Sequence, residues 1–162
     1  MTKKSEILRR EDIYEYNELE KIIDIGTIPF MNLTKVCIDF ILNEFLTKDT
    51  MQKLNIDDKT KIKARHYMFQ AKAYFSEKTI TKETLKEERI SCWEAHDKCG
   101  YESTQRKLLR LIVCFLYDEE STAEEAKHAQ DDELSIIFNC LYELGSGYCK
   151  QLRLYLQNNL VQ

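Results

Sequence analysis

The sequence predicts an all-α protein, and three observations support this prediction. Glycine occurs four times and proline once in 162 residues, so few residues interrupt helices or form tight hairpins. Apolar residues recur at spacings of three and four along most of the chain, as one face of a helix requires. Serine, threonine or aspartate precedes several of these segments and can cap a first turn. We expect a single-domain bundle of about six to eight helices over residues 1–162.

Two helices are expected in the first third of the chain. The segment from Ser5 to Ile25 spaces its apolar residues among charges, as an amphipathic helix does, and Gly26 and Pro29 follow its end. A second helix is expected from Asn32 to Leu46. Residues 47–55 should form a short connection with about one helical turn.

The next two helices have recognisable N-caps. Asp57 or Asp58 can cap a helix that reaches about Phe75, and Thr81 can cap another that ends at Gly100. The predicted buried stripe of the first of these helices consists of Ile62, Tyr67, Ala71 and Tyr74.

The most apolar segment, LLRLIVCFLY, is expected to be the central helix of the bundle, near residues 104–118. It is apolar on nearly all sides, whereas a surface helix keeps one polar face. Ser103 or Thr104 can cap it. Ser121 to Glu124 fits a capping box for a short acidic helix. Asp131 to Glu133 opens a further helix that Gly145 to Gly147 interrupts, and a last helix ends the chain.

Charge and apolar patterning exclude some kinds of partner. The net charge of −4 and the pI near 5.5 argue against general nucleic-acid binding, which needs clustered lysine and arginine. No apolar run is long enough to cross a membrane, and the N-terminus lacks the apolar core of a signal peptide. We therefore expect a cytoplasmic protein with reduced thiols. Its six cysteines are Cys37, Cys92, Cys99, Cys114, Cys140 and Cys149.

The stretch RISCWEAHDKCG concentrates residues that could carry chemistry. On a helix, Cys92, His96 and Cys99 would share one stripe and could supply three of the four ligands of zinc. Cys92 with His96, oriented by Asp97, would also resemble an activated thiol.

A structural role explains this stretch better. No second Cys/His pair lies nearby in sequence, and the backbone N–H groups of a helix interior cannot serve an oxyanion. We expect Cys92 and Trp93 to help fill the core, while Glu94 and Lys98 face water. No recognised catalytic or phosphate-binding motif occurs elsewhere, so we expect a protein that is not an enzyme and has no metal or cofactor.

Acidic residues gather late in the chain, where eight of sixteen residues are acidic. They form either a solvated connection, with acids favoured at helix N-termini, or a docking patch for a basic protein. The candidate partner-binding residues, chosen from charge alone, are Asp118, Glu119, Glu120, Glu124 and Glu125.

Three segments together carry a family resemblance: AKAYFSEKTITKETLKEERISCWEAHD, LLRLIVCFLYDE and ELSIIFNCLYEL. They resemble the Imm5-type all-α immunity proteins of bacterial polymorphic toxin systems. Trp93, Asp97, Arg110 and Tyr117 match the pattern and are interpreted as structural. The resemblance implies a cytoplasmic inhibitor that binds a cognate toxin domain, often a nuclease with a basic cleft, and blocks it without catalysis.

Two alternatives remain open. The chain could be a helical adaptor or a homodimer formed through an apolar stripe of Tyr148, Leu152, Tyr155 and Leu156. It could also be a metal-binding protein or thiol enzyme centred on Cys92, His96 and Cys99.

Overall fold

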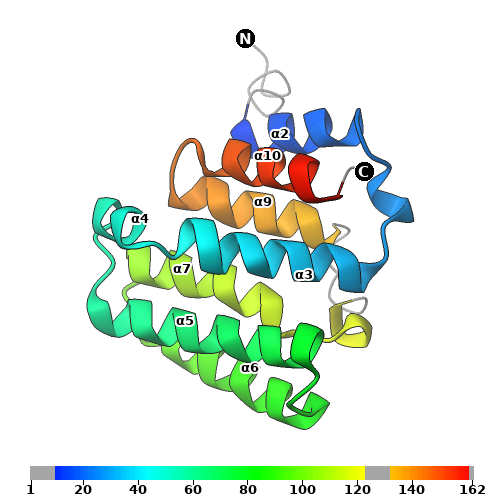
Figure 1. The fold of residues 1–162 in the computed structure, drawn as a ribbon. Helices are drawn as coiled ribbons and strands as arrows, with labels where there is room; N and C mark the ends of the chain where they lie inside the picture. The colour runs from blue at the N-terminus through cyan, green and yellow to red at the C-terminus, as the bar shows by residue number, and fades with distance from the viewer. Residues whose placement is uncertain (1–9, 123–131, 161–162) are drawn as a thin grey trace.

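The structure, a computed structural model, describes residues 10–122 and 132–160 and is all-α over these ranges, as predicted (Figure 1). Its buried apolar side chains form one continuous cluster. None of the helices in these ranges has the length and apolarity needed to cross a membrane.

Eight α-helices of the described residues carry labels in chain order. They are α2 (Glu11–Glu20), α3 (Phe30–Phe40), α4 (Lys48–Lys53), α5 (Asp58–Lys72), α6 (Lys82–Asp97), α7 (Thr104–Val113), α9 (Glu133–Leu144) and α10 (Tyr148–Leu160). Helices α3 and α5 continue into π-helical turns at Ile41–Phe45 and Ala73–Glu77, and 3-10 turns lie at Ile25–Thr27 and Cys114–Leu116.

Helix α7 is the central helix, as its sequence predicted. It packs against α5, α6 and α9, and its buried residues lie on several sides of the helix. They are Leu108, Leu109, Leu111, Ile112 and Val113. On the far side of α9, helix α10 packs against α2, α3 and α9, so that α2 lies at one edge of the bundle and α6 at the other (Figure 1).

Predicted N-caps set the starts of three helices. The Asp57 carboxylate accepts a hydrogen bond from the Thr60 backbone N–H at 2.7 Å and opens α5. The Thr81 and Ser103 hydroxyl groups accept corresponding bonds and open α6 and α7. These caps satisfy N–H groups that have no partner inside the helix.

Two predictions about the first and third helices are wrong in detail. Helix α2 ends at Glu20 rather than near Ile25, because Asp24 caps a separate 3-10 turn by accepting from the Gly26 N–H at 3.2 Å. Ile62 is 67% exposed, although it was expected in a buried stripe. The buried face of α5 includes Tyr67, and five residues place Ile62 about 140° away from it around the helix.

The acidic helix begins earlier than its capping box predicted. Residues 119–122 are already helical, and the Asp118 carboxylate accepts from the Ser121 N–H at 2.9 Å. Asp118 rather than Ser121 is therefore the cap, since a carboxylate at this position accepts the N–H of the third helical residue.

Candidate functional site

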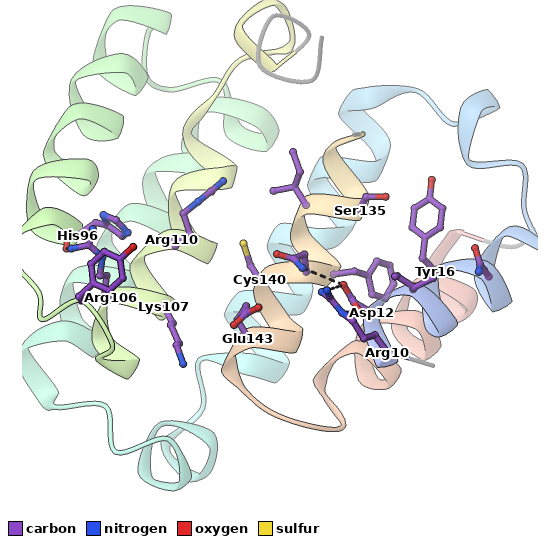
Figure 2. Close-up of a pocket in the computed structure, with 16 residues that line it drawn as sticks. Arg10, Asp12, Tyr16, His96, Arg106, Lys107, Arg110, Ser135, Cys140 and Glu143 are labelled. Carbon is purple, nitrogen blue, oxygen red and sulfur yellow. Dashed lines mark hydrogen bonds and ion pairs between the residues drawn. The ribbon is translucent and has the colours of Figure 1, made fainter. Parts of the chain in front are cut away.

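A trough runs along one face of the bundle, with α9 as its floor. Helix α9 packs against α2 on one side and α7 on the other, and these two helices form the walls (Figure 2). The trough has a volume of about 740 Å³. Its floor contains Ser135, Ile136, Asn139, Cys140 and Glu143, which share one face of α9.

The α7 wall of the trough is cationic. Arg106, Lys107 and Arg110 line it, and none of the three makes an ion pair with a described residue. Arg106 donates to the Cys99 carbonyl at 3.2 Å and lies over the ring of Tyr101, which is 83% exposed at the rim. Arg106 is thus held in place by carbonyl and ring contacts, and no carboxylate of the described residues forms an ion pair with any of the three cations.

The α2 wall has the opposite character, because its charges are paired. Arg10 binds Asp12 through two hydrogen bonds of 3.2 and 2.9 Å, and the Asn139 amide donates to the same carboxylate at 3.2 Å. The Tyr16 hydroxyl donates to Asp132, and burial with this carboxylate raises the pKa of Tyr16. This wall is a closed set of polar contacts.

A smaller cavity of about 60 Å³ adjoins the trough, and we call it the thiol cavity. It is lined by Trp93, Arg110, Cys114, Tyr117, Thr122 and Glu133, together with Ile136. Arg110 and Ile136 line both spaces. The Trp93 indole N–H donates to the Tyr117 hydroxyl at 3.0 Å and closes one side.

Two titratable groups in the thiol cavity have perturbed pKa values. Contact with the Cys140 thiol, aided by the Arg110 guanidinium, lowers the pKa of Cys114 to about 7 despite burial. Burial, with the neighbouring Cys114, raises the pKa of the Glu133 carboxyl to about 8. The cavity therefore holds a thiol whose pKa is lowered beside a carboxyl whose pKa is raised, and such perturbed groups are concentrated at functional sites.

The acidic candidates from the sequence fall into three situations. Glu119 and Glu120 are exposed, and Glu120 pairs with Lys82 at 3.0 Å. Asp118 is only 7% exposed, because its carboxylate caps residues 119–122 and also faces Lys82. Its role as a direct contact is thereby limited. Glu124 and Glu125 lie outside the described residues.

The stretch around Trp93 adopts the core role expected of it. Cys92 is fully buried and its thiol donates to the Leu109 carbonyl at 3.7 Å, while burial raises its pKa. His96 Nδ1 lies 2.9 Å from Asp97, and the Cys99 thiol donates to the Ala95 carbonyl. In the part of the chain that the structure describes, no three His, Cys, Asp or Glu side chains gather to hold a metal ion.

The apolar stripe considered for a homodimer belongs to the core. Leu152 and Leu156 are fully buried, and Tyr148 and Tyr155 pack at ring distances of 5.1 and 5.5 Å against Phe45 and Phe40. This stripe is occupied because α10 is packed between α2, α3 and α9. Leu152 and Leu156 therefore cannot contribute to a dimer surface in this fold, and the homodimer stays an alternative prediction.

Sequence reasoning missed the α7 cations and the thiol cavity. Arg106 and Arg110 are four residues apart on a helix, and this spacing could have indicated a shared face. The approach of Cys114 to Cys140 and Glu133 joins different segments, which no local pattern reveals.

Comparisons with known proteins give no relative. No family model, no curated protein and no solved structure matches the chain.

Proposed function

We propose that this protein binds and neutralises a toxin protein, as an immunity-type inhibitor, using the trough and the acidic turn at Glu119 and Glu120. The observation that carries the proposal is the trough itself. One face of α9 is left uncovered between two helical walls, and its volume of about 740 Å³ suits the insertion of partner side chains.

The charges on this surface would fix the orientation of a bound partner. Arg106, Lys107 and Arg110 can bind acidic groups of a partner. Glu119 can bind basic ones, and so can Glu120 if it exchanges its exposed pair with Lys82. The acidic turn lies at the Arg110 end of the trough (Figure 2), since Thr122 and Arg110 line the same cavity. A partner with a basic region beside an acidic one would bind in a single orientation, because reversing it would oppose like charges.

The exposed Tyr101 adds an aromatic contact at the opposite end. It lies over Arg106 and is 83% exposed. Tyrosine and arginine are enriched among residues that dominate binding energies, because they combine a large contact area with hydrogen bonding. The proposed interface therefore extends from Tyr101, along the α7 wall, to Glu120.

A growth-rescue experiment tests the proposal. The product of the gene next to this one would be expressed in a bacterium with and without this chain. We expect that product to arrest growth alone, and this chain to restore growth and to co-purify with it at equal stoichiometry. If the neighbouring product is harmless, or if it is toxic and this chain neither binds nor rescues, the proposal is wrong.

Paired variants test the surface. Lys107→Glu should weaken the complex at least about tenfold, whereas Lys86→Glu, an exposed change on α6 outside the trough, should leave it unchanged. Glu119→Lys with Glu120→Lys should act similarly, with Glu87→Lys as the matched control. Equal effects of test and control variants would exclude the trough as the interface.

A further inference from the structure

The thiol cavity collects buried polar atoms that have no partner. Among the described residues, two buried side-chain atoms lack a hydrogen-bond partner, Thr122 Oγ1 and Glu133 Oε2, and both residues line this cavity. Buried polar groups in proteins are nearly always paired. Two exceptions facing one small space indicate a site shaped for a small polar molecule. A volume of about 60 Å³ corresponds to roughly two water molecules.

The same cavity holds a thiol placed for reaction. The Arg110 guanidinium donates to the Cys114 Sγ atom at 3.2 Å, and a fixed positive charge at this distance favours the thiolate. The Cys140 thiol is a neighbour of Cys114 and lowers the pKa of Cys114 through a side-chain contact. Figure 2 shows Cys140 and Arg110 facing one another across the gap between α9 and α7.

We infer that Cys114 and Cys140 form a redox-active thiol pair that reduces a small hydroperoxide, with hydrogen peroxide as the size that the cavity admits. The site does not depend on the proposed toxin binding. The thiol cavity adjoins the trough, because Arg110 and Ile136 line both spaces, and Cys140 lines the trough.

The reaction balances with these groups and one peroxide. The Cys114 thiolate attacks one peroxide oxygen, so that an S–O bond forms, the O–O bond breaks and the leaving hydroxide takes a proton to become water. Protonated Glu133 can supply that proton, since its pKa is raised to about 8. The Cys140 thiol then attacks the Cys114 sulfur, an S–S bond forms and the S–O bond breaks, and a second water leaves. Two thiols are oxidised and one peroxide is reduced.

The remaining cysteines lack these features. Cys37, Cys92 and Cys149 are buried, and burial raises the pKa of each thiol. Cys99 is partly exposed, and its thiol, like that of Cys114, donates to the carbonyl four residues earlier, but no described cation contacts its sulfur. The structure therefore distinguishes Cys114 by its arginine, its partner thiol and its cavity.

The test is the reaction of the reduced full-length chain with equimolar hydrogen peroxide, followed by mass spectrometry without reduction. We expect one disulfide between Cys114 and Cys140 and a loss of two free thiols. A lowered pKa keeps more of Cys114 as the thiolate near neutral pH, so Cys114 should be oxidised faster than Cys99.

Variants assign the roles. Cys140→Ser should stop at a sulfenic acid on Cys114, which mass spectrometry detects as the gain of one oxygen atom. Cys114→Ser should lose the fast reaction, and Cys99→Ser should leave it unchanged. In Glu133→Gln, the rate of the first step should no longer fall above about pH 8, because the donor that ionises there is absent. Circular dichroism would confirm that each variant is folded.

The inference is overturned if folded protein oxidises at Cys99 as fast as at Cys114, or if the peroxide product contains no bond between Cys114 and Cys140. No partner protein enters this experiment, so its failure leaves the toxin-binding proposal standing. Failure of growth rescue likewise leaves the thiol chemistry standing.

Discussion

Two polar regions of this bundle differ in whether their buried polar groups have hydrogen-bond or ion-pair partners. Along the contact of α2 with α9 and α10, the buried carboxylates are paired: Asp12 with Arg10 and Asn139, and Glu15 with Arg153. In the thiol cavity, one oxygen of Glu133 and the hydroxyl of Thr122 have no partner among the described residues.

This difference in pairing distinguishes buried polar groups that stabilise the fold from buried polar groups that destabilise it. A paired buried carboxylate recovers much of its desolvation cost, and removing its partner is strongly destabilising. An unpaired buried group costs about 1–3 kcal/mol and persists only when another requirement maintains it. The α2 contact is therefore expected to act as structure, and the thiol cavity as a site.

The largest effect is expected when the α2 contact is broken. Glu15→Ala would leave the Arg153 guanidinium with only the Gln157 side chain as a described partner. We expect a loss of about 3 kcal/mol in the free energy of unfolding, at the lower limit for buried pairs because Arg153 keeps a partner. Glu20→Ala on the exposed side of α2 should cost less than about 0.5 kcal/mol.

Denaturant unfolding measures both variants, and hydrogen exchange shows whether α2 detaches first. The double variant Glu15→Ala with Arg153→Met should recover part of the loss, because it leaves no buried charge unpaired. A Glu15→Ala loss below about 1 kcal/mol would remove the contrast between the two regions.

The second largest loss of stability is expected when the aromatic wall of the thiol cavity is removed. Trp93 is partly buried, and its indole N–H donates to the Tyr117 hydroxyl. The Arg110 Cζ atom lies over the Trp93 ring, 5.4 Å from the ring centre. Trp93→Ala should cost about 2–3 kcal/mol, less than the 3–5 kcal/mol of a fully buried aromatic residue. Denaturant unfolding gives the value, and a loss below about 1 kcal/mol would show that this wall is not tightly packed.

The sequence predicted the apolar part of the fold better than its polar part. The dense apolar run identified α7 as the central helix, and residues with short polar side chains identified the starts of α5, α6 and α7. Both signals are local, because helix periodicity and capping act within about one or two turns. The burial of Cys92 followed from the same periodicity.

The polar sites depend on contacts between distant segments. Glu133 was explained from the sequence as an acid favoured at a helix N-terminus, yet its carboxylate turns inward and accepts from Thr34, 99 residues away. A first-turn acid can face solvent or the bundle, and only the packing of α9 decides between them. Cys114, in the thiol cavity, and Cys140, in the adjoining trough, likewise come from different segments, so neither cysteine alone indicated a site.

Stability should depend on pH through Glu133. Its pKa rises from an ordinary value near 4.5 when unfolded to about 8 when folded, so between these values the folded state binds more protons. Stability is then greatest below about pH 4.5 for this group and falls as pH rises towards 8. Glu133→Gln removes this dependence and should be more stable than the parent at pH 8.

Thermal or denaturant unfolding at pH 5 and pH 8 measures this difference. The parent and Glu133→Gln should have nearly equal stability at pH 5, where the carboxyl of the folded parent is protonated. An equal difference in the free energy of unfolding between the two proteins at both pH values would mean that the effect of the variant is unrelated to ionisation.

The smallest effect is expected at Thr122, where a matched pair of threonines compares the two kinds of polar group within one site. Thr34 Oγ1 donates to Glu133 at 3.3 Å, whereas Thr122 Oγ1 has no partner among the described residues. Thr34→Val should therefore cost about 1 kcal/mol, and Thr122→Val should be neutral or stabilising by up to about 1 kcal/mol. Denaturant unfolding resolves the sign. If both variants lose the same stability, the Thr122 hydroxyl has a hydrogen-bond partner in solution. The buried polar groups of the cavity would then be paired, as those of the α2 contact are.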